Sequence, residues 1–272
     1  MKLCVSNIAW AADQDVIALE ILARHGIEAV EIAPTKYWPA PCNPSDTEIY
    51  DCKHFWSAGG VPIQAMQALL FGMPNLSIFT ASVADETRKY LIHILRIGAA
   101  AGATRYVFGS PKNRDRGSLS TGEANRIAAD FFRPIADTAR ELGVVFCIEP
   151  NPTVYQCNFM TNTAEALAVV RAVDHPGLGV HLDSGIMFLN EESVDAVVAS
   201  AAPYLRHFHV SHPQLAAVTD DGPIDHAAVS RALRNNGYCG MVSVEMRGAE
   251  NPADNLARLN VACEVLNRHY RN

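Results

Sequence analysis

The chain has 272 residues, of which 49% are hydrophobic and 19% are charged, and its formal net charge is −7. The length suits a single α/β barrel, and the composition is that of a globular protein in water. An acidic chain without a basic run disfavours nonspecific binding to nucleic acid or to anionic membranes. No stretch is apolar for long enough to span a bilayer, and the start MKLCVSNIAW does not have the pattern of a signal peptide.

The cysteine content agrees with a reducing compartment. The seven cysteines are an odd number, and no CxxC pair occurs among them. We therefore interpret them as reduced thiols and expect a cytoplasmic location.

Strand-like apolar runs alternate with amphipathic helical segments along the whole chain. In chain order we expect a strand at Leu3–Ser6, a helix at Asp13–His25, strands at Ala29–Ile32 and Pro62–Ala65, a helix at Ala84–Ala101, a strand at Arg105–Phe108, a helix at Gly122–Leu142, a strand at Val144–Ile148, a helix at Thr163–Ala172, a strand at Gly179–Leu182, a helix at Ser193–Ala201, a strand at Arg206–Val210, a helix at His226–Asn235, a strand at Val242–Glu245 and a helix at Pro252–Arg268. This alternation predicts an α/β fold with a single (β/α)8 TIM barrel, formed by residues 1–272 as one domain. A doubly wound open sheet is the alternative, but no glycine-rich phosphate loop follows the first strand.

Several helix ends carry capping signals. Left-handed C-caps are expected at Gly26, Gly143 and Gly237, and N-caps at Asp13, Thr121 and Asn162.

Four residues that can bind metal close four of the predicted strands in the second half of the chain. They are Glu149, Asp183, His209 and Glu245, and they are spaced by about one βα unit. A glutamate at a strand end can simply cap a helix or pair with a lysine at the rim. However, the strands of a barrel point their carboxyl ends at one mouth, and buried carboxylates that meet there need a counterion. Three carboxylates and an imidazole predict a site for one divalent metal ion, Mn²⁺, Mg²⁺, Co²⁺ or Zn²⁺.

The period of two along a strand places further side chains near this site. His181 shares a face with Asp183 and lies one layer deeper, where it either supports the site or is a hydrogen-bonded core histidine. Arg247 shares a face with Glu245 if the strand continues that far. It then either holds a hydroxyl-rich or anionic substrate or forms a salt bridge at the rim.

The segments GIEAVEIAP, IEP followed by Asn151, HLDSG, FHVSHPQL and VSVEMR resemble the xylose isomerase-like TIM-barrel superfamily of sugar isomerases and epimerases, and the resemblance covers essentially the whole chain. It implies that Glu149, Asp183, His209 and Glu245 hold the metal. It also implies that Glu149 and Glu245 are the acid/base pair, which moves a proton next to a substrate carbonyl through an enediolate. The implied activity is that of a metal-dependent sugar isomerase or epimerase.

The sequence offers several candidate residues for contact with substrate at the barrel mouth. Those for contact with a small carbohydrate are Asn7, Trp10, Glu31, Gln67, Asn151, His181, His212 and Arg247. Aromatic residues in such loops equally often serve packing alone. No nucleic-acid or membrane partner is expected, and a homo-oligomer is a guess from the general frequency of symmetric assemblies.

The sequence also departs from the pattern of this superfamily. Many relatives carry a histidine where this chain has Ile186, and an acidic residue where it has His212. An arginine that often follows is not evident, because Gln214 and Leu215 occupy that loop. These differences affect the substrate contacts more than the metal. Two alternatives therefore stay open: a metal-dependent lyase or dehydratase of an inosose- or dehydroshikimate-like compound, and a non-catalytic carbohydrate-binding barrel.

Overall fold

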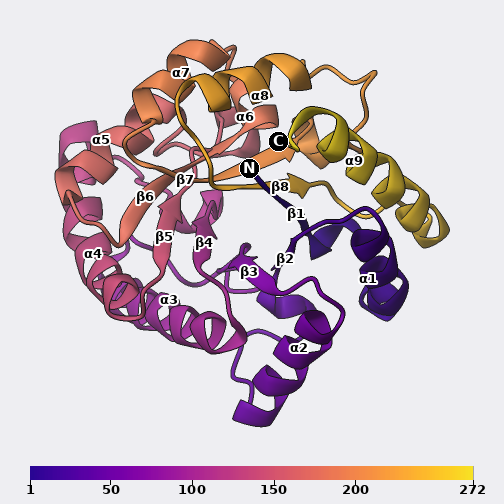
Figure 1. Cartoon of the computed structure of the whole chain (residues 1–272). Helices are drawn as coiled ribbons and strands as arrows, with labels where there is room; N and C mark the ends of the chain where they lie inside the picture. The colour runs from indigo at the N-terminus through magenta and orange to yellow at the C-terminus, as the bar shows by residue number, and fades with distance from the viewer. Residues whose placement is uncertain (272) are drawn as a thin grey trace.

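The computed structural model describes residues 1–271 and shows a closed barrel of eight parallel strands in chain order, with the helices outside it (Figure 1). The strands are Lys2–Ser6 (β1), Ala29–Ile32 (β2), Ile63–Met66 (β3), Arg105–Phe108 (β4), Val145–Ile148 (β5), Leu178–Asp183 (β6), Leu205–Ser211 (β7) and Met241–Glu245 (β8). The predicted (β/α)8 TIM barrel is confirmed, and every strand was placed to within about one residue at each end, the usual uncertainty of such boundaries.

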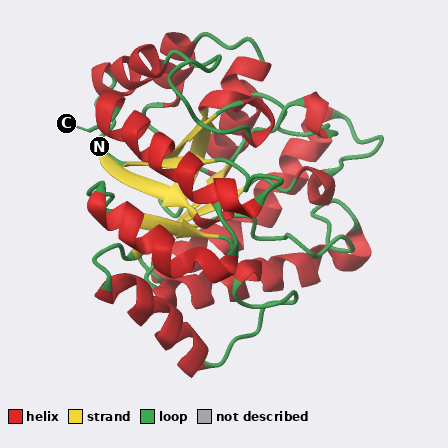
Figure 2. Cartoon of the chain, turned by 90° about the vertical axis from the view of Figure 1, so that its right-hand side faces the viewer, coloured by secondary structure: helices red, strands yellow, loops and turns green. Residues whose placement is uncertain are grey.

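The helices cover the barrel on all sides, and Figure 2 shows them as a red layer around the yellow strands. They are Asp15–Arg24 (α1), Asp46–Ala58 (α2), Ala81–Ala101 (α3), Thr121–Glu141 (α4), Thr163–Val173 (α5), Ser184–Leu189 (α6), Val194–Ala201 (α7), His226–Asn235 (α8) and Asn255–His269 (α9). Helices α2 and α6 were not predicted from the sequence. Helix α2 begins with a capping box in which Ser45 and Glu48 bind each other's backbone N–H groups. Helix α6 is too short to show a helical period.

The capping predictions were partly wrong. Asn162 caps α5 as expected, and its side chain accepts a hydrogen bond from the backbone of the third residue of the following turn. Helix α4 is capped by Ser120 rather than Thr121. Asp13 lies in a short 3₁₀ turn, so Gln14 precedes α1 and makes no side-chain cap. The predicted C-cap glycines all have positive φ angles: Gly26 (64°), Gly143 (71°) and Gly237 (72°).

The strand pleat separates two sets of side chains. On β1, Leu3 and Val5 belong to the large hydrophobic cluster that also contains the helix side chains. Their neighbour Cys4 belongs to a small separate cluster of the barrel interior, with Ala29 of β2 as one of its members. Because the side-chain period of a strand is two, the residue after next on each strand also faces the interior. This alternation brings polar side chains from several strands into the centre of the barrel.

Two predictions on bulk properties can be compared with the described part of the chain. No helix within residues 1–271 is both long and apolar enough to cross a membrane. All seven cysteines are free thiols, as expected, and Cys239 is the exposed one among them.

Candidate metal centre

Asp183 ends β6 and also begins α6, and this double position fixes its carboxylate. Its Oδ1 accepts hydrogen bonds from the backbone N–H of Ile186 at 2.7 Å and from the Ser211 hydroxyl at 2.7 Å. Its Oδ2 is buried without a hydrogen-bond partner among the described residues. That oxygen lies 3.9 Å from Nδ1 of His209. One carboxylate oxygen is therefore held by the protein, and the other is aimed into the mouth.

His209 lies beside Asp183 in the register of β6 and β7 and is fully buried. Its Nε2 is 2.9 Å from Oε2 of Glu31, which is also fully buried. Nδ1 faces a second carboxylate, that of Glu245 at 3.2 Å, so an ion bound at Nδ1 would leave the ring proton on Nε2, where Glu31 accepts it. The lone pair of Nδ1 then faces the mouth, which is the tautomer that a metal ligand needs.

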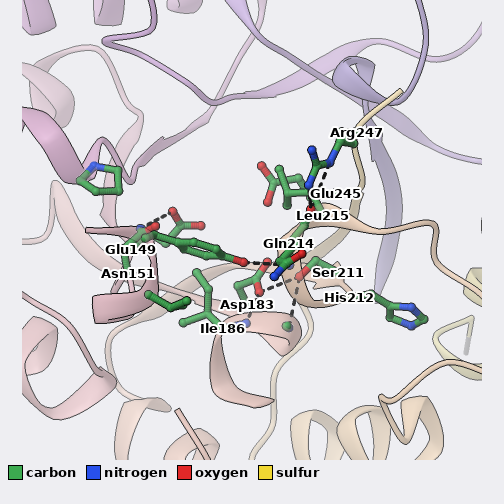
Figure 3. A pocket seen from close by; sticks show the side chains of 14 residues that line it. Glu149, Asn151, Asp183, Ile186, Ser211, His212, Gln214, Leu215, Glu245 and Arg247 are labelled. Carbon is green, nitrogen blue, oxygen red and sulfur yellow. Dashed lines mark hydrogen bonds between the residues drawn. The ribbon is translucent and has the colours of Figure 1, made fainter. Parts of the chain in front are cut away.

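Glu149 and Glu245 lie on opposite sides of the pocket (Figure 3), and each has an oxygen close to Nδ1 of His209. Glu149 follows β5, and its Oε1 lies 3.8 Å from Nδ1 of His209. Its other oxygen accepts a hydrogen bond from Nδ2 of Asn151 at 2.9 Å. Glu245 ends β8, and its Oε2 lies 3.2 Å from the same Nδ1. Glu149, Asp183 and His209, together with His181, each offer one ligand atom within 4.8 Å of the others, and Glu245 joins this group through its contact with His209.

The electrostatics of this cluster favour a bound cation. Burial, together with the charge of Glu245, raises the pKa of Glu149 to about 8 and that of Asp183 to about 6. Burial opposes protonation of His209, but the Glu31 and Glu245 carboxylates raise its pKa well above the ordinary value. Without a cation, the carboxylates can relieve their mutual repulsion only by taking up protons. A divalent ion would replace those protons.

The donor set fits such an ion. The three carboxylate oxygens lie between 3.2 and 3.9 Å from Nδ1 of His209. Bonds of about 2.0–2.2 Å from oxygen and imidazole to a metal place neighbouring ligand atoms at roughly this spacing. The unpartnered oxygen of Asp183 supports the same reading, because a buried carboxylate oxygen is rarely left without a partner. We conclude that these residues are suited to hold one divalent cation.

A buried polar layer lies beneath the four residues. Glu31 accepts hydrogen bonds from His209 and from the Ser243 hydroxyl at 2.7 Å, and its Oε1 is 3.3 Å from Nε2 of His207. Burial alone would raise the pKa of Glu31, but the imidazoles of His209 and His207 hold it well below the ordinary value. Nε2 of His181 lies 3.4 Å from Oε1 of Glu149. Glu31 and His181, expected to contact substrate, thus support the mouth from behind.

A cavity of about 560 Å³ opens above the centre. Its lining residues are Pro111, Glu149, Asn151, Val154, Tyr155, Asp183, Gly185, Ile186, Ser211, His212, Gln214, Leu215, Glu245 and Arg247. Three of the predicted substrate residues, Asn151, His212 and Arg247, are among them. The volume lies in the range of small-molecule pockets.

Three other candidates are engaged in packing between loops, away from that lining. Asn7 is buried and accepts a hydrogen bond from the backbone N–H of Ala33. Trp10 is buried, and its indole N–H donates to Asp15 at 2.6 Å. Gln67 donates to the hydroxyl of Ser6 within the barrel. None of the three lines the cavity, and Nδ2 of Asn7 is buried without a hydrogen-bond partner among the described residues.

Ser211, Tyr155 and the contact of Arg114 with Glu149 were not predicted from the sequence. Ser211 carried a usable signal, because it lies two residues after His209 on the same strand face. Tyr155 lies in a loop with no periodicity. Arg114 is fully buried, and its Nη1 donates to the backbone oxygen of Glu149 at 2.7 Å. Nothing in a sequence marks such a contact between two loops in advance.

Comparisons with known proteins show the family and the fold of this chain. Residues 19–266 match the family model described as xylose isomerase-like TIM barrel. A D-psicose 3-epimerase of Ruminiclostridium cellulolyticum is 27% identical over 247 residues, which are 87% of this chain and 79% of that protein. A ketose 3-epimerase of Arthrobacter globiformis is 27% identical over 65% of this chain and 61% of its own length.

Solved structures show the same fold at lower identity. The crystal structure of D-psicose 3-epimerase with D-tagatose from Clostridium cellulolyticum H10 superimposes with a TM-score of 0.80, at 19% identity and with 100% of both chains covered. The IOLI protein with a bound zinc atom gives a TM-score of 0.79 at 18% identity, covering 99% of this chain and 98% of that one. With the family model spanning most of its length, this chain belongs to the xylose isomerase-like TIM-barrel family.

Proposed function

We propose that this protein is a divalent-metal-dependent epimerase or isomerase of a small sugar or sugar-like keto compound. The observation that carries the proposal is the placement of Glu149 and Glu245 on opposite sides of one cavity, each with an oxygen facing Nδ1 of His209. A substrate carbon held between two carboxylates can lose a proton to one of them and regain a proton from the other.

The residues divide the reaction as follows. Glu149 removes the proton from the carbon between the carbonyl and the adjacent hydroxyl group, which gives an enediolate. Glu245 returns a proton on the other face, which inverts that carbon, or at the neighbouring carbon, which isomerises the compound. Asn151 holds one oxygen of Glu149, so that the other oxygen stays directed at the substrate. When bound, a divalent ion supplies Lewis-acid polarisation of the substrate oxygens.

The relatives support this class of reaction. The two curated relatives compared above are named as 3-epimerases of D-psicose and of ketoses. A neighbouring structure holds zinc, which supports a metal in the present site without fixing its identity. Metal choice in the cell depends on availability as well as on ligands.

The test is a screen of ketoses in D2O with protein loaded with Mn²⁺, Co²⁺, Mg²⁺ or Zn²⁺. We expect deuterium to enter the substrate at one carbon, as seen by NMR, with no change of mass beyond the exchange. The variants Glu149→Gln and Glu245→Gln should abolish turnover while the far-UV CD spectrum is kept, and Glu28→Gln, at an exposed position, should not. Near-wild-type activity in either active-site variant would remove the assigned roles. A product that has lost water would identify a dehydratase instead.

A further inference from the structure

A second cavity lies at the end of the barrel opposite the metal centre, and we call it the basal pocket. Its residues come from the starts of β4 and β7, from the end of α7 and from the loop between α8 and β8. In Figure 2 the N label marks the start of β1 and therefore this end of the barrel. The volume is about 270 Å³, and the lining residues are Arg105, Val198, Ala202, Leu205, Arg206, Asn236, Gly237, Tyr238, Cys239 and Gly240.

Two arginines line the basal pocket, and the protein uses only part of their hydrogen-bonding capacity. Nε of Arg105 donates to the backbone oxygen of Arg206 at 3.1 Å, and its Nη1 donates to that of Thr104 at 2.9 Å. Arg206 donates through Nη1 to the backbone oxygen of Leu205 at 3.1 Å. A guanidinium has five N–H groups. Both Nη2 atoms and Nε of Arg206 therefore remain without a partner among residues 1–271.

The two arginine charges also lack a counterion. No acidic side chain lines the basal pocket, and within residues 1–271 no carboxylate forms an ion pair with Arg105 or Arg206. Burial raises the pKa of the Cys147 thiol to about 12, and the charges of both arginines act on this pKa in the opposite direction. Both cations therefore lie near the same part of the barrel. Like charges repel each other there, and an anion between them would remove that repulsion.

Two glycines leave the space that the side chains around the basal pocket need. A Cβ atom at Gly179 would overlap with Cγ of Arg206, and one at Gly240 would lie 2.7 Å from Cζ of Tyr238. The Tyr238 hydroxyl donates to the backbone oxygen of Met241 at 2.6 Å, which fixes its ring. The backbone is thus shaped to admit an arginine and a tyrosine side by side with the pocket.

A phosphate group matches these features. Its oxygens fit the planar fork of a guanidinium, and its charge of nearly −2 balances two arginines. We propose that the basal pocket binds a phosphate group, either as inorganic phosphate or as a small monoester whose organic part lies against Val198, Ala202 and Leu205. The pocket lies at the other end of the barrel from the metal centre, so this inference does not depend on the proposed function.

The experiment is a calorimetric titration of the full-length protein, loaded with Mn²⁺ and freed of excess ion, with inorganic phosphate, propyl phosphate and butyrate. Both phosphates should bind at least about tenfold more tightly than butyrate, whose single charge balances only one arginine. Tighter binding of propyl phosphate would identify a monoester as the ligand, and equal affinity of the two phosphates would identify inorganic phosphate. Butyrate that binds as tightly as the phosphates, or no binding of either phosphate at millimolar concentration, would overturn the inference.

Variants show where the phosphate binds. Arg206→Gln removes one cation and should weaken phosphate binding at least about tenfold, with an unchanged far-UV CD spectrum. Arg206→Lys keeps the charge but not the fork and should have an intermediate affinity. Arg126→Gln makes the same change of net charge at an exposed position of α4 and should bind phosphate as the wild type does. Phosphate that binds at the metal centre instead would be insensitive to Arg206→Gln, and that result would overturn the inference.

A thiol in the pocket reports on the same site independently. Cys239 is exposed and belongs to the lining. Its alkylation by iodoacetamide, followed by mass spectrometry of the peptide, should slow as phosphate is added, with a midpoint at the calorimetric dissociation constant. A rate that stays constant while phosphate binds would place the anion elsewhere and overturn the inference.

Discussion

The most informative single change is Glu31→Gln, because Glu31 touches no cavity and yet should control the metal. Its Oε2 receives hydrogen bonds from His209 at 2.9 Å and from Ser243 at 2.7 Å. An amide has nearly the same shape as the carboxylate but carries no charge. Whichever way it is turned, the negative charge that makes His209 a stronger ligand is lost. If the amide nitrogen faces His209, the ring proton must also move to Nδ1, the atom that should bind the ion.

The expected fall in metal affinity can be taken from other metal sites. Loss of a residue that hydrogen-bonds a metal ligand lowers metal affinity about 10- to 100-fold. With the ion at about 100 times the wild-type dissociation constant, binding stabilises the wild type by about 2.7 kcal/mol. At the same concentration of ion, the weakened variant gains only about 0.4 to 1.4 kcal/mol. The loss should therefore be visible in unfolding as well as in direct titration.

The assay is calorimetric titration with Mn²⁺, together with urea unfolding in the presence and absence of the ion. Glu20→Gln, at an exposed position of α1, is the matched control and should behave as the wild type. The far-UV CD spectrum verifies that the metal-free variant is folded. An affinity for Mn²⁺ within about twofold of the wild type would refute the reasoning that Glu31 positions His209.

Three further predictions address other parts of the site. Asp183→Asn should reduce the metal content, which we expect to be one ion per chain by elemental analysis, and an unchanged content would exclude Asp183 as a ligand. Gly109→Ala would place a methyl group 2.3 Å from Oε2 of Glu149, so metal affinity and turnover should both fall at least about tenfold, whereas Gly122→Ala, with open space around it, should change neither. Burial and neighbouring imidazoles lower the pKa of His226 to about 4, below its ordinary value of about 6.5. The unfolded chain therefore takes up this proton first, and stability should fall as the pH drops from about 6.5 to about 4. His226→Asn should flatten that slope in urea unfolding, and an identical slope in both proteins would contradict the assignment.

The sequence by itself determined the barrel and the four residues that meet at its mouth. Parallel strands buried on both faces are long apolar runs, and glycines and capping residues divide them from amphipathic helices, so the alternation was visible without a structure. The carboxyl ends of all strands of such a barrel lie at the same mouth. This rule predicted the positions of Glu149, Asp183, His209 and Glu245. Helix α2 was not predicted, although its capping box is present in the sequence.

Only the tertiary structure decided which polar residues face the cavity and which lie behind it. Glu31 also lies near the carboxyl end of a strand, yet it points into the barrel interior beneath His209, because depth along the barrel axis depends on the stagger between strands. The side chain of Asn7 is held by the backbone N–H of Ala33, which is distant in sequence, and no local pattern encodes such a contact. The hydrogen bonds of Tyr155 and Arg247 to the backbone of Gln214 form only when the closed sheet brings three loops together. Local patterns fix the period and the ends of elements, whereas contacts between loops arise from the closure of the barrel.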